Sequence, residues 1–384
     1  MSGFPLRDWQ KDALGLWKAA GNRGIVEVVT GGGKTIFALS CIREIASETT
    51  LVIVPTIALL DQWWEEASAF FGISLQDINI VTGSGKIRTG TINLVVLNTA
   101  AKLNLSKRKG DYFLIVDECH KAASLKYRTA LDGATVATLG LSATPERPYD
   151  EGLEEVLVPK LGQIIYRYTY RDALRDKVIV PFQLKNVVFD LEPERQAEYD
   201  KLTKAIGRSI NQGGMEDEKT IALLLRRARV MNLSVNRIRL ALRLILRHEG
   251  ARTIVFHEDI EACDIIQEVL SEAKLRSGVY HSKMKLRLRA EVLSAYRRGD
   301  LDVLITCRAL DEGFNVPETQ IGIIAASTAT RRQRIQRLGR VLRPVKGKDG
   351  AIVYSLVATE PEIRRLRIEE TDLEGVADVT WGRA

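Results

Sequence analysis

A glycine-rich turn near the N-terminus combines residue types that bind phosphate. Residues 30–35 read Thr-Gly-Gly-Gly-Lys-Thr, after an apolar run that predicts a strand and before a helical pattern. Glycines let backbone N–H groups approach phosphate oxygens, a helix start favours an anion, and Lys34 supplies a cation. The turn therefore predicts a phosphate-binding loop, with Thr35 as a ligand of Mg²⁺. Because Val28 stands where the strict phosphate-loop pattern has glycine, a plain tight turn is the alternative.

Two adjacent carboxylates, Asp117 and Glu118, end a second apolar run, residues 113–116. Open α/β sheets bind their ligands at the carboxyl ends of strands, where this pair is expected to lie. Asp117 is suited to hold Mg²⁺, and Glu118 is suited to polarise an attacking water. For the pair alone, an acidic helix start that satisfies free amides is the alternative. Beside a phosphate loop, the pair favours hydrolysis of a nucleoside triphosphate.

Short β-branched runs alternate with helical patterns in both halves of the chain. Strands are expected at residues 24–30, 51–56, 92–99, 113–117 and 138–142, and again at 253–257, 303–308, 321–327 and 351–357. Their continuous apolar character is typical of parallel strands that are covered on both faces. The sequence therefore predicts an α/β protein with two doubly wound parallel-sheet domains.

A helix-rich stretch, residues 192–250, separates the two halves. Its second part has no acidic residue between Lys219 and His248 and carries seven arginines: Arg226, Arg227, Arg229, Arg237, Arg239, Arg243 and Arg247. Apolar positions such as Ile238, Leu242 and Ile245 recur at helical spacing among the arginines. The stretch is either an amphipathic helix with a solvated basic face or an insertion that faces a polyanion.

Composition excludes several classes of protein. Of the 384 residues, 45% are hydrophobic and 27% are charged, which is typical of a globular protein, and the net charge of +7 permits a polyanionic partner. No apolar run approaches the about 20 residues of a membrane span, and no secretory signal is evident, so an intracellular (cytoplasmic) protein is expected. The four cysteines show no spacing of a zinc site or a disulfide framework, and we expect buried thiols.

Together these motifs resemble the superfamily 2 nucleic-acid helicases and translocases, with Asp117-Glu118-Cys119-His120 as a DECH variant of the DEAD/DEAH box. The resemblance covers roughly residues 4–344. It implies two tandem RecA-like domains, with ATP and Mg²⁺ as cofactors. The expected divisions are a first RecA-like domain at 1–165, a connector and basic helical insertion at 166–250, a second RecA-like domain at 251–360, and a C-terminal tail at 361–384.

The resemblance also implies roles for individual residues. Residues 336–343 match a QxxGRxxR pattern whose arginines act on the γ-phosphate, so the implied catalytic residues are Lys34, Glu118, Arg340 and Arg343. The implied nucleotide-binding residues are Arg7, Gln10, Thr30, Gly31, Gly32, Gly33, Lys34, Thr35, Gly313 and Gln336, with Thr35 and Asp117 on the metal. The implied coupling residues are His120, Ser142 and Thr144, and the nucleic-acid contacts are Pro55, Thr56, Asn98, Thr99, His281 and Thr306.

Some of these residues have simpler readings. Residues 336–343 alone could form a basic surface helix, Gly313 could belong to an ordinary strand-to-loop turn, and His281 could be a surface turn residue.

Residues 54–63, 281–283 and 336–344 look most like the XPB-like DNA repair helicases and their phage relatives. This similarity implies an ATP-dependent DNA helicase or translocase that acts on single-stranded, forked or branched DNA and moves 3′ to 5′. A nuclease or repair factor is an expected partner. The alternatives are an RNA helicase and a nucleic-acid clamp that ATP switches without unwinding.

Overall fold

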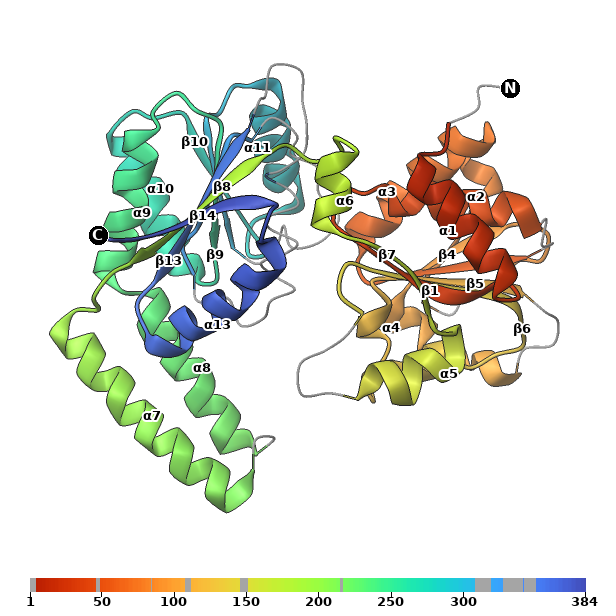
Figure 1. Ribbon diagram of the computed structural model, residues 1–384, viewed down its shortest axis with the longest axis horizontal. Coiled ribbons are helices and arrows are strands. Elements are labelled where there is room, and N and C mark those ends of the chain that lie inside the picture. Colours follow the sequence, from red (N-terminus) through yellow and green to blue (C-terminus); the bar gives the residue numbers. More distant parts are fainter. Residues whose placement is uncertain are drawn as a thin grey trace. The chain divides into compact units, whose positions relative to one another are not determined.

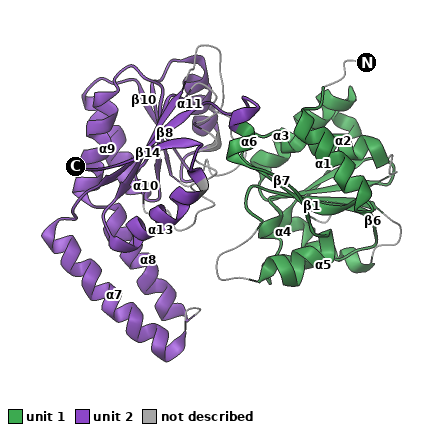
Figure 2. Cartoon of the chain, viewed as in Figure 1, with its two compact units in different colours: residues 1–173, 312–314 green, residues 174–311, 315–384 purple. Residues whose placement is uncertain are grey.

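The computed structural model describes residues 5–45, 49–83, 85–107, 112–145, 151–214, 217–307, 319–326, 341 and 350–384. Figure 2 shows two compact units, the first ending at Ala173 and the second beginning at Leu174. Within the described residues, each unit is built on a seven-stranded sheet whose pairings are all parallel. The predicted α/β fold with two doubly wound domains is therefore confirmed.

The first unit has the strand order β3-β4-β2-β5-β6-β1-β7. Its strands are β1 Arg23–Val28, β2 Thr50–Val54, β3 Asn79–Val81, β4 Ile92–Val96, β5 Tyr112–Asp117, β6 Thr135–Ser142 and β7 Ile164–Tyr168. Its α-helices are α1 Asp8–Ala19, α2 Lys34–Ile45, α3 Ile57–Phe71, α4 Leu97–Ala100 and α5 Val158–Leu161, and α6 Tyr170–Arg175 spans the unit boundary. Every residue of β2 and β5 is buried, as expected for strands covered on both faces.

Helix α1 packs onto the sheet of the first unit through buried residues at helical spacing. Its buried residues Trp9, Ala13 and Trp17 recur every four positions and therefore share one helix face. The indole Nε1 of Trp17 donates to the carbonyl oxygen of Thr138 in β6 at 2.9 Å. A buried tryptophan needs such an acceptor for its N–H group, so this bond joins helix packing to the sheet.

The second unit has the strand order β10-β11-β9-β12-β13-β8-β14. Its strands are β8 Phe182–Val188, β9 Thr253–His257, β10 Ser277–His281, β11 Val303–Cys307, β12 Ile321–Ile324, β13 Ala351–Val357 and β14 Ala377–Arg383. Its helices are α7 Pro193–Gly213, α8 Glu218–Asn232, α9 Val235–Arg247, α10 Ile260–Glu272, α11 Leu286–Arg298 and α13 Glu360–Glu370. Strands β8, β10 and β14 lie outside the segments that the sequence predicted as strands, as do β3 and β7 of the first unit.

The helix-rich stretch divides into two parts with different packing. Helices α7 and α8 form an antiparallel pair that projects from the second unit (Figure 1), whereas α9 buries Ile238, Leu244 and Ile245 in the core of that unit. Among the seven arginines, Arg226 pairs with Glu198 and Arg229 pairs with Glu261. The predicted apolar face of the basic helix is therefore present in α9, and two of the arginines in α8 are paired with carboxylates.

Arg237 is the arginine most completely removed from water. Its side chain is 0% exposed, and its Nη2 donates to Oε1 of Glu362 at 3.1 Å. Its Nη1 donates to the carbonyl oxygen of Leu356 at 3.0 Å, and the guanidinium lies over the ring of Phe189. Glu362 also accepts from the backbone N–H groups of Ala358 and Thr359 at the start of α13. This buried pair fastens α9 to α13 beneath the end of β13.

Removing Glu362 should destabilise the protein much more than removing an exposed carboxylate. Glu362→Ala leaves the guanidinium of Arg237 buried without its counter-charge, which costs about 3–5 kcal/mol. Glu198→Ala removes the partner of exposed Arg226 and should cost less than about 1 kcal/mol. Urea unfolding followed by far-UV circular dichroism measures both changes. Equal losses in the two variants would contradict a supporting role for the buried pair.

Candidate active site

The predicted phosphate loop connects β1 to α2, at the carboxyl end of its strand. Gly31 and Gly33 have φ angles of +87° and +98°, in the region that favours glycine. A Cβ added to Gly32 would lie 2.4 Å from Cγ1 of Val28, so only glycine fits against that valine. Val28, which stands where the strict phosphate-loop pattern has glycine, therefore packs closely against Gly32. Helix α2 still begins at Lys34.

Lys34 and Glu118 form a buried ion pair. The Lys34 Nζ donates to Glu118 Oε1 at 3.1 Å, with the two side chains 13% and 11% exposed. Burial would lower the pKa of Lys34, but Glu118 and Asp117 raise it above its ordinary value. Burial would raise the pKa of Glu118, but Lys34 and His120 together lower it to about 2. Both groups are therefore charged at neutral pH, and the loop is tied to the end of β5.

The backbone of Glu118 is also unusual. Its φ of +49° places it in the left-handed region, which a residue with a side chain seldom occupies. Such conformations persist where surrounding contacts hold them and are concentrated at functional sites. This turn directs the adjacent carboxylates of Asp117 and Glu118 to different partners.

Asp117 binds two neutral donors. Its Oδ2 accepts from the indole Nε1 of Trp63 at 2.9 Å, and its Oδ1 accepts from the backbone N–H of Glu118 at 2.9 Å. The pKa of Asp117 is raised to about 6, because burial and the charge of Glu118 raise it more than Lys34 and Trp63 lower it. Sequence reasoning assigned Trp63 no part in this site, because nothing local links a residue of α3 to the end of β5.

The three predicted coupling residues lie in one hydrogen-bonded chain next to Glu118. The Nδ1 atom of His120 is 2.9 Å from Ser142 Oγ and 3.5 Å from Glu118 Oε2. Ser142 Oγ also accepts from the backbone N–H of Thr144 at 3.1 Å. A change at the carboxylate of Glu118 can therefore reach the segment after β6 through His120 and Ser142.

Arg7, Trp9 and Gln10 bind the carbonyl oxygens of the phosphate loop. Arg7 Nη1 and Trp9 Nε1 both donate to the carbonyl oxygen of Gly32, at 2.8 and 3.2 Å. Gln10 Nε2 donates to the carbonyl oxygen of Gly33 at 3.0 Å, and Gln10 Oε1 accepts from the backbone N–H of Arg7 at 2.8 Å. Gln10, which the family resemblance implies as a nucleotide-binding residue, is thus buried and supports the loop. The contact of Trp9 was not anticipated from the sequence.

The predicted nucleic-acid contacts of the first unit follow two strands on one side of the phosphate site. Pro55 and Thr56 follow β2, and Asn98 and Thr99 lie in α4 directly after β4. Because β4, β2 and β5 are neighbours in the sheet, these residues share its carboxyl edge. The Thr56 hydroxyl accepts from the backbone N–H of Leu59 and caps α3, while Asn98 Oδ1 accepts from the hydroxyl of Tyr127.

The second unit is described for only part of its predicted site. His281 ends β10, with Nε2 3.2 Å from Asp264 Oδ1, and Thr306 lies within β11 with 1% of its surface exposed. Gly313, Gln336, Arg340 and Arg343 lie outside the described residues.

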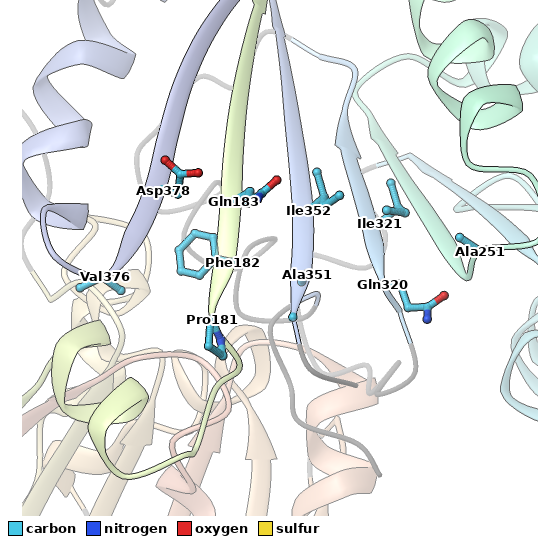
Figure 3. Close-up of a pocket in the computed structure, with 11 residues that line it drawn as sticks. Pro181, Phe182, Gln183, Ala251, Gln320, Ile321, Ala351, Ile352, Val376 and Asp378 are labelled. Carbon is cyan, nitrogen blue, oxygen red and sulfur yellow. The ribbon is translucent and has the colours of Figure 1, made fainter. Parts of the chain in front are cut away.

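A hollow of about 760 Å³ lies in the second unit (Figure 3). Its lining includes the residues that begin three strands: Phe182 in β8, Ile321 in β12 and Ala351 in β13. His281, by contrast, ends its strand. Since neighbouring strands run parallel, the hollow lies at the amino edge of the sheet, opposite the edge where ligands of this fold class bind.

The oxygen atoms of the first unit suit a hard cation bound with a phosphate. Asp117 offers a carboxylate and Thr35, next to Lys34, offers a hydroxyl, while the Thr30 hydroxyl oxygen is buried and has no hydrogen-bond partner among the residues that the structure describes. Mg²⁺ is commonly held by one or two carboxylates together with substrate phosphates and water. The residues present therefore fit a nucleotide-bound Mg²⁺.

Two family models match the chain. Residues 3–147 match "Type III restriction enzyme, res subunit", and residues 236–345 match "Helicase conserved C-terminal domain". The DNA 3′-5′ translocase XPB2 of Sulfurisphaera tokodaii is 29% identical over 91% of this chain and 80% of that protein. The DNA 3′-5′ helicase XPB of Mycobacterium tuberculosis is 25% identical over 93% of this chain but only 61% of its own length.

Solved structures share the fold. The DNA-bound Type ISP restriction-modification enzyme LlaBIII matches all of this chain and 31% of its own, with a TM-score of 0.67 and 15% identity. Dbp5 of S. cerevisiae bound to RNA and ADP BeF3 matches 98% of this chain and 89% of its own, with a TM-score of 0.59 and 15% identity. At these identities the likeness establishes two tandem RecA-like lobes and nothing about substrate.

Gln10→Ala should weaken the use of ATP through the phosphate loop. The change leaves the carbonyl oxygen of half-buried Gly33 without its donor, and a penalty of about 1.4 kcal/mol corresponds to a roughly tenfold higher KM. Steady-state ATP turnover measures the effect. Lys11→Ala is the control, because Lys11 is exposed and pairs only with Asp8 in the described residues. An unchanged KM in Gln10→Ala would contradict the supporting role of this glutamine.

Proposed function

Because the chain belongs to the superfamily 2 helicases and translocases, we propose that it is an ATP-driven DNA motor that moves 3′ to 5′ along a strand and unwinds or remodels forked or branched DNA. The observation that carries the proposal is the buried cluster of Lys34, Asp117 and Glu118 at the carboxyl ends of β1 and β5. A protein that only binds nucleic acid has no chemical need for this combination.

Lys34 and Glu118 would exchange partners when ATP binds. The ammonium of Lys34 suits a phosphate oxygen, and moving onto one would take it away from Glu118. Glu118 would then lose the partner that chiefly lowers its pKa, and burial would raise that pKa. A carboxylate with a higher pKa is a better proton acceptor. Nucleotide binding would thereby prepare Glu118 to orient and deprotonate the attacking water.

Thr35 and Asp117 would hold the Mg²⁺ that accompanies the nucleotide, and this ion would offset the charge that develops on the phosphates. The chain from Glu118 through His120 and Ser142 to Thr144 would report the state of the site to the segment after β6. In the proposal, Arg340 and Arg343, with Gly313 and Gln336, complete the nucleotide contacts from the second unit.

We propose DNA rather than RNA as the nucleic acid along which the protein moves, for two reasons. The relatives described above are named for DNA, and the predicted contacts Pro55, Thr56, Asn98 and Thr99 share the edge of the sheet that holds the phosphate loop. His281 and Thr306 are the proposed contacts of the second unit. Gripping of a phosphate backbone is largely independent of base sequence. We therefore propose low sequence specificity, with a nuclease or repair factor as the partner that selects the site of action.

ATP turnover at one salt concentration, alone and with single-stranded DNA, forked DNA or RNA, tests the function. We expect DNA to stimulate turnover and forked DNA to stimulate it most. Lys34→Ala and Glu118→Gln should each lose at least about a hundredfold of the stimulated rate, while Lys18→Ala, on the exposed side of α1, should keep it. Stimulation by RNA alone would overturn the DNA assignment. DNA binding without turnover would favour a clamp.

Helix α9 offers a second, independent contact with DNA. Arg239, Arg243 and Arg247 are exposed and recur every four residues, so they form one stripe with a rise of roughly 6 Å along the helix axis between successive Cα atoms. In the described part of the chain no carboxylate is paired with them. Burial lowers the pKa of His248, and the cations Arg247 and Lys185 lower it further, which indicates a positive potential beside the stripe. We propose that this arginine stripe binds DNA phosphates.

Reversing the charge of the arginine stripe should weaken DNA binding and its salt dependence together. In Arg239→Glu/Arg243→Glu/Arg247→Glu, the slope of log K against log salt should fall by about one for each phosphate contact that is lost. The matched control reverses Arg276, Arg287 and Arg298, which each pair with a carboxylate in the same unit. Fluorescence anisotropy over a salt series measures both slopes. Equal slopes in the two triple variants would contradict a specific contact.

A further inference from the structure

Trp63 lies in α3, a helix that supplies none of the predicted catalytic or metal-binding residues. Its side chain is completely buried, together with Leu59, Leu60 and Ala67 on the same helix face. The helix is held at its start by the Thr56 cap, whose hydroxyl accepts from the backbone N–H of Leu59. The indole therefore lies on a helix whose start is fixed. A functional group is placed accurately when it lies on such a fixed element.

The indole contacts the carboxylate expected to hold the metal. Trp63 Nε1 donates to Asp117 Oδ2 at 2.9 Å, and the other oxygen, Oδ1, accepts from the Glu118 backbone N–H. With one donor on each oxygen, the plane of the carboxylate is determined by two rigid groups. Phenylalanine would keep most of the apolar bulk at this position, but it has no N–H group.

The chemistry of the donor distinguishes this contact from a simple salt bridge. An indole N–H donates without carrying a positive charge and does not titrate. Lysine or arginine at this position would neutralise the charge of Asp117, as Lys34 neutralises the charge of Glu118. Such a side chain would also compete with a bound metal ion. Trp63 therefore orients the carboxylate and leaves its negative charge available.

We propose that Trp63 is the positioning residue of the metal site, whose indole fixes the orientation in which Asp117 meets the Mg²⁺ of the bound nucleotide. This inference rests on the proposed function, since it requires Asp117 to be a metal ligand. Partners of metal ligands commonly control affinity, and their loss weakens metal binding by about 10- to 100-fold.

Direct metal binding tests the inference without relying on turnover. Mn²⁺ is the probe, because it replaces Mg²⁺ in oxygen sites and is measured by electron paramagnetic resonance; the full-length protein is titrated in the presence of ADP. Trp63→Phe should bind Mn²⁺ at least about tenfold more weakly than the wild type. The binding of ADP without metal should be unchanged.

Trp17→Phe is the matched control. Trp17 is also completely buried in the first unit, and its indole also donates one bond of 2.9 Å, to the carbonyl oxygen of Thr138. The two variants lose the same atoms and a similar hydrogen bond, so a general loss of packing affects both. Only Trp63→Phe should lose affinity for Mn²⁺. Equal Mn²⁺ affinity in both variants, or an equal loss in both, overturns the inference.

The remaining outcomes separate this inference from the proposed function. If the wild-type protein with ADP binds no Mn²⁺, the metal assignment fails and the inference fails with it. If the wild type binds Mn²⁺ and Trp63→Phe binds it equally well, only the inference fails.

A measurement on the wild-type protein covers the case in which Trp63→Phe does not fold. In ¹H–¹⁵N spectra of the protein with ADP, Mg²⁺ should shift the Trp63 indole signal and leave the Trp17 signal in place. Phenylalanine variants of the other four tryptophans assign the Trp63 signal by elimination. A Trp63 signal that does not respond to Mg²⁺ overturns the inference.

Discussion

The buried ion pair of Lys34 and Glu118 is the interaction on which the first unit depends. Each charge would be costly away from water by itself, and each is tolerated because the other lies 3.1 Å away. The pair joins the loop after β1 to the end of β5, across the intervening strand β6. A pair that a phosphate can break is an effective switch, because breaking it leaves a buried carboxylate that must find a new partner or a proton.

Asp117 and Glu118 show how partners, rather than burial, set the chemistry of neighbouring carboxylates. Both are buried, yet the pKa of Asp117 is raised to about 6 and that of Glu118 is lowered to about 2. Asp117 meets two neutral donors, whereas Glu118 meets the ammonium of Lys34. The left-handed backbone at Glu118 makes this division possible by turning the two side chains toward different neighbours.

The second unit uses one residue type for different purposes on successive turns of its helices. Arg237 is buried against Glu362 and supports the core, and Arg226 and Arg229 pair with carboxylates of other elements. Arg239, Arg243 and Arg247 face outward on α9. The number of basic residues in a stretch of sequence therefore does not give the positive charge that is exposed to a partner. Some of these residues are buried or paired within the protein.

The sequence by itself determined the two doubly wound sheets, the phosphate loop and the acidic pair, because apolar periodicity and glycine placement act over a few residues. His120 follows β5 and Ser142 ends β6, and because these parallel strands are neighbours both residues lie at one edge of the sheet; their coupling role stays a prediction. Only the tertiary structure decided that Gln10 binds Gly33, that Trp63 binds Asp117, and that β8 and β14 complete the second sheet. These contacts join residues distant along the chain, and no local pattern of residue types specifies which partner a buried donor will find.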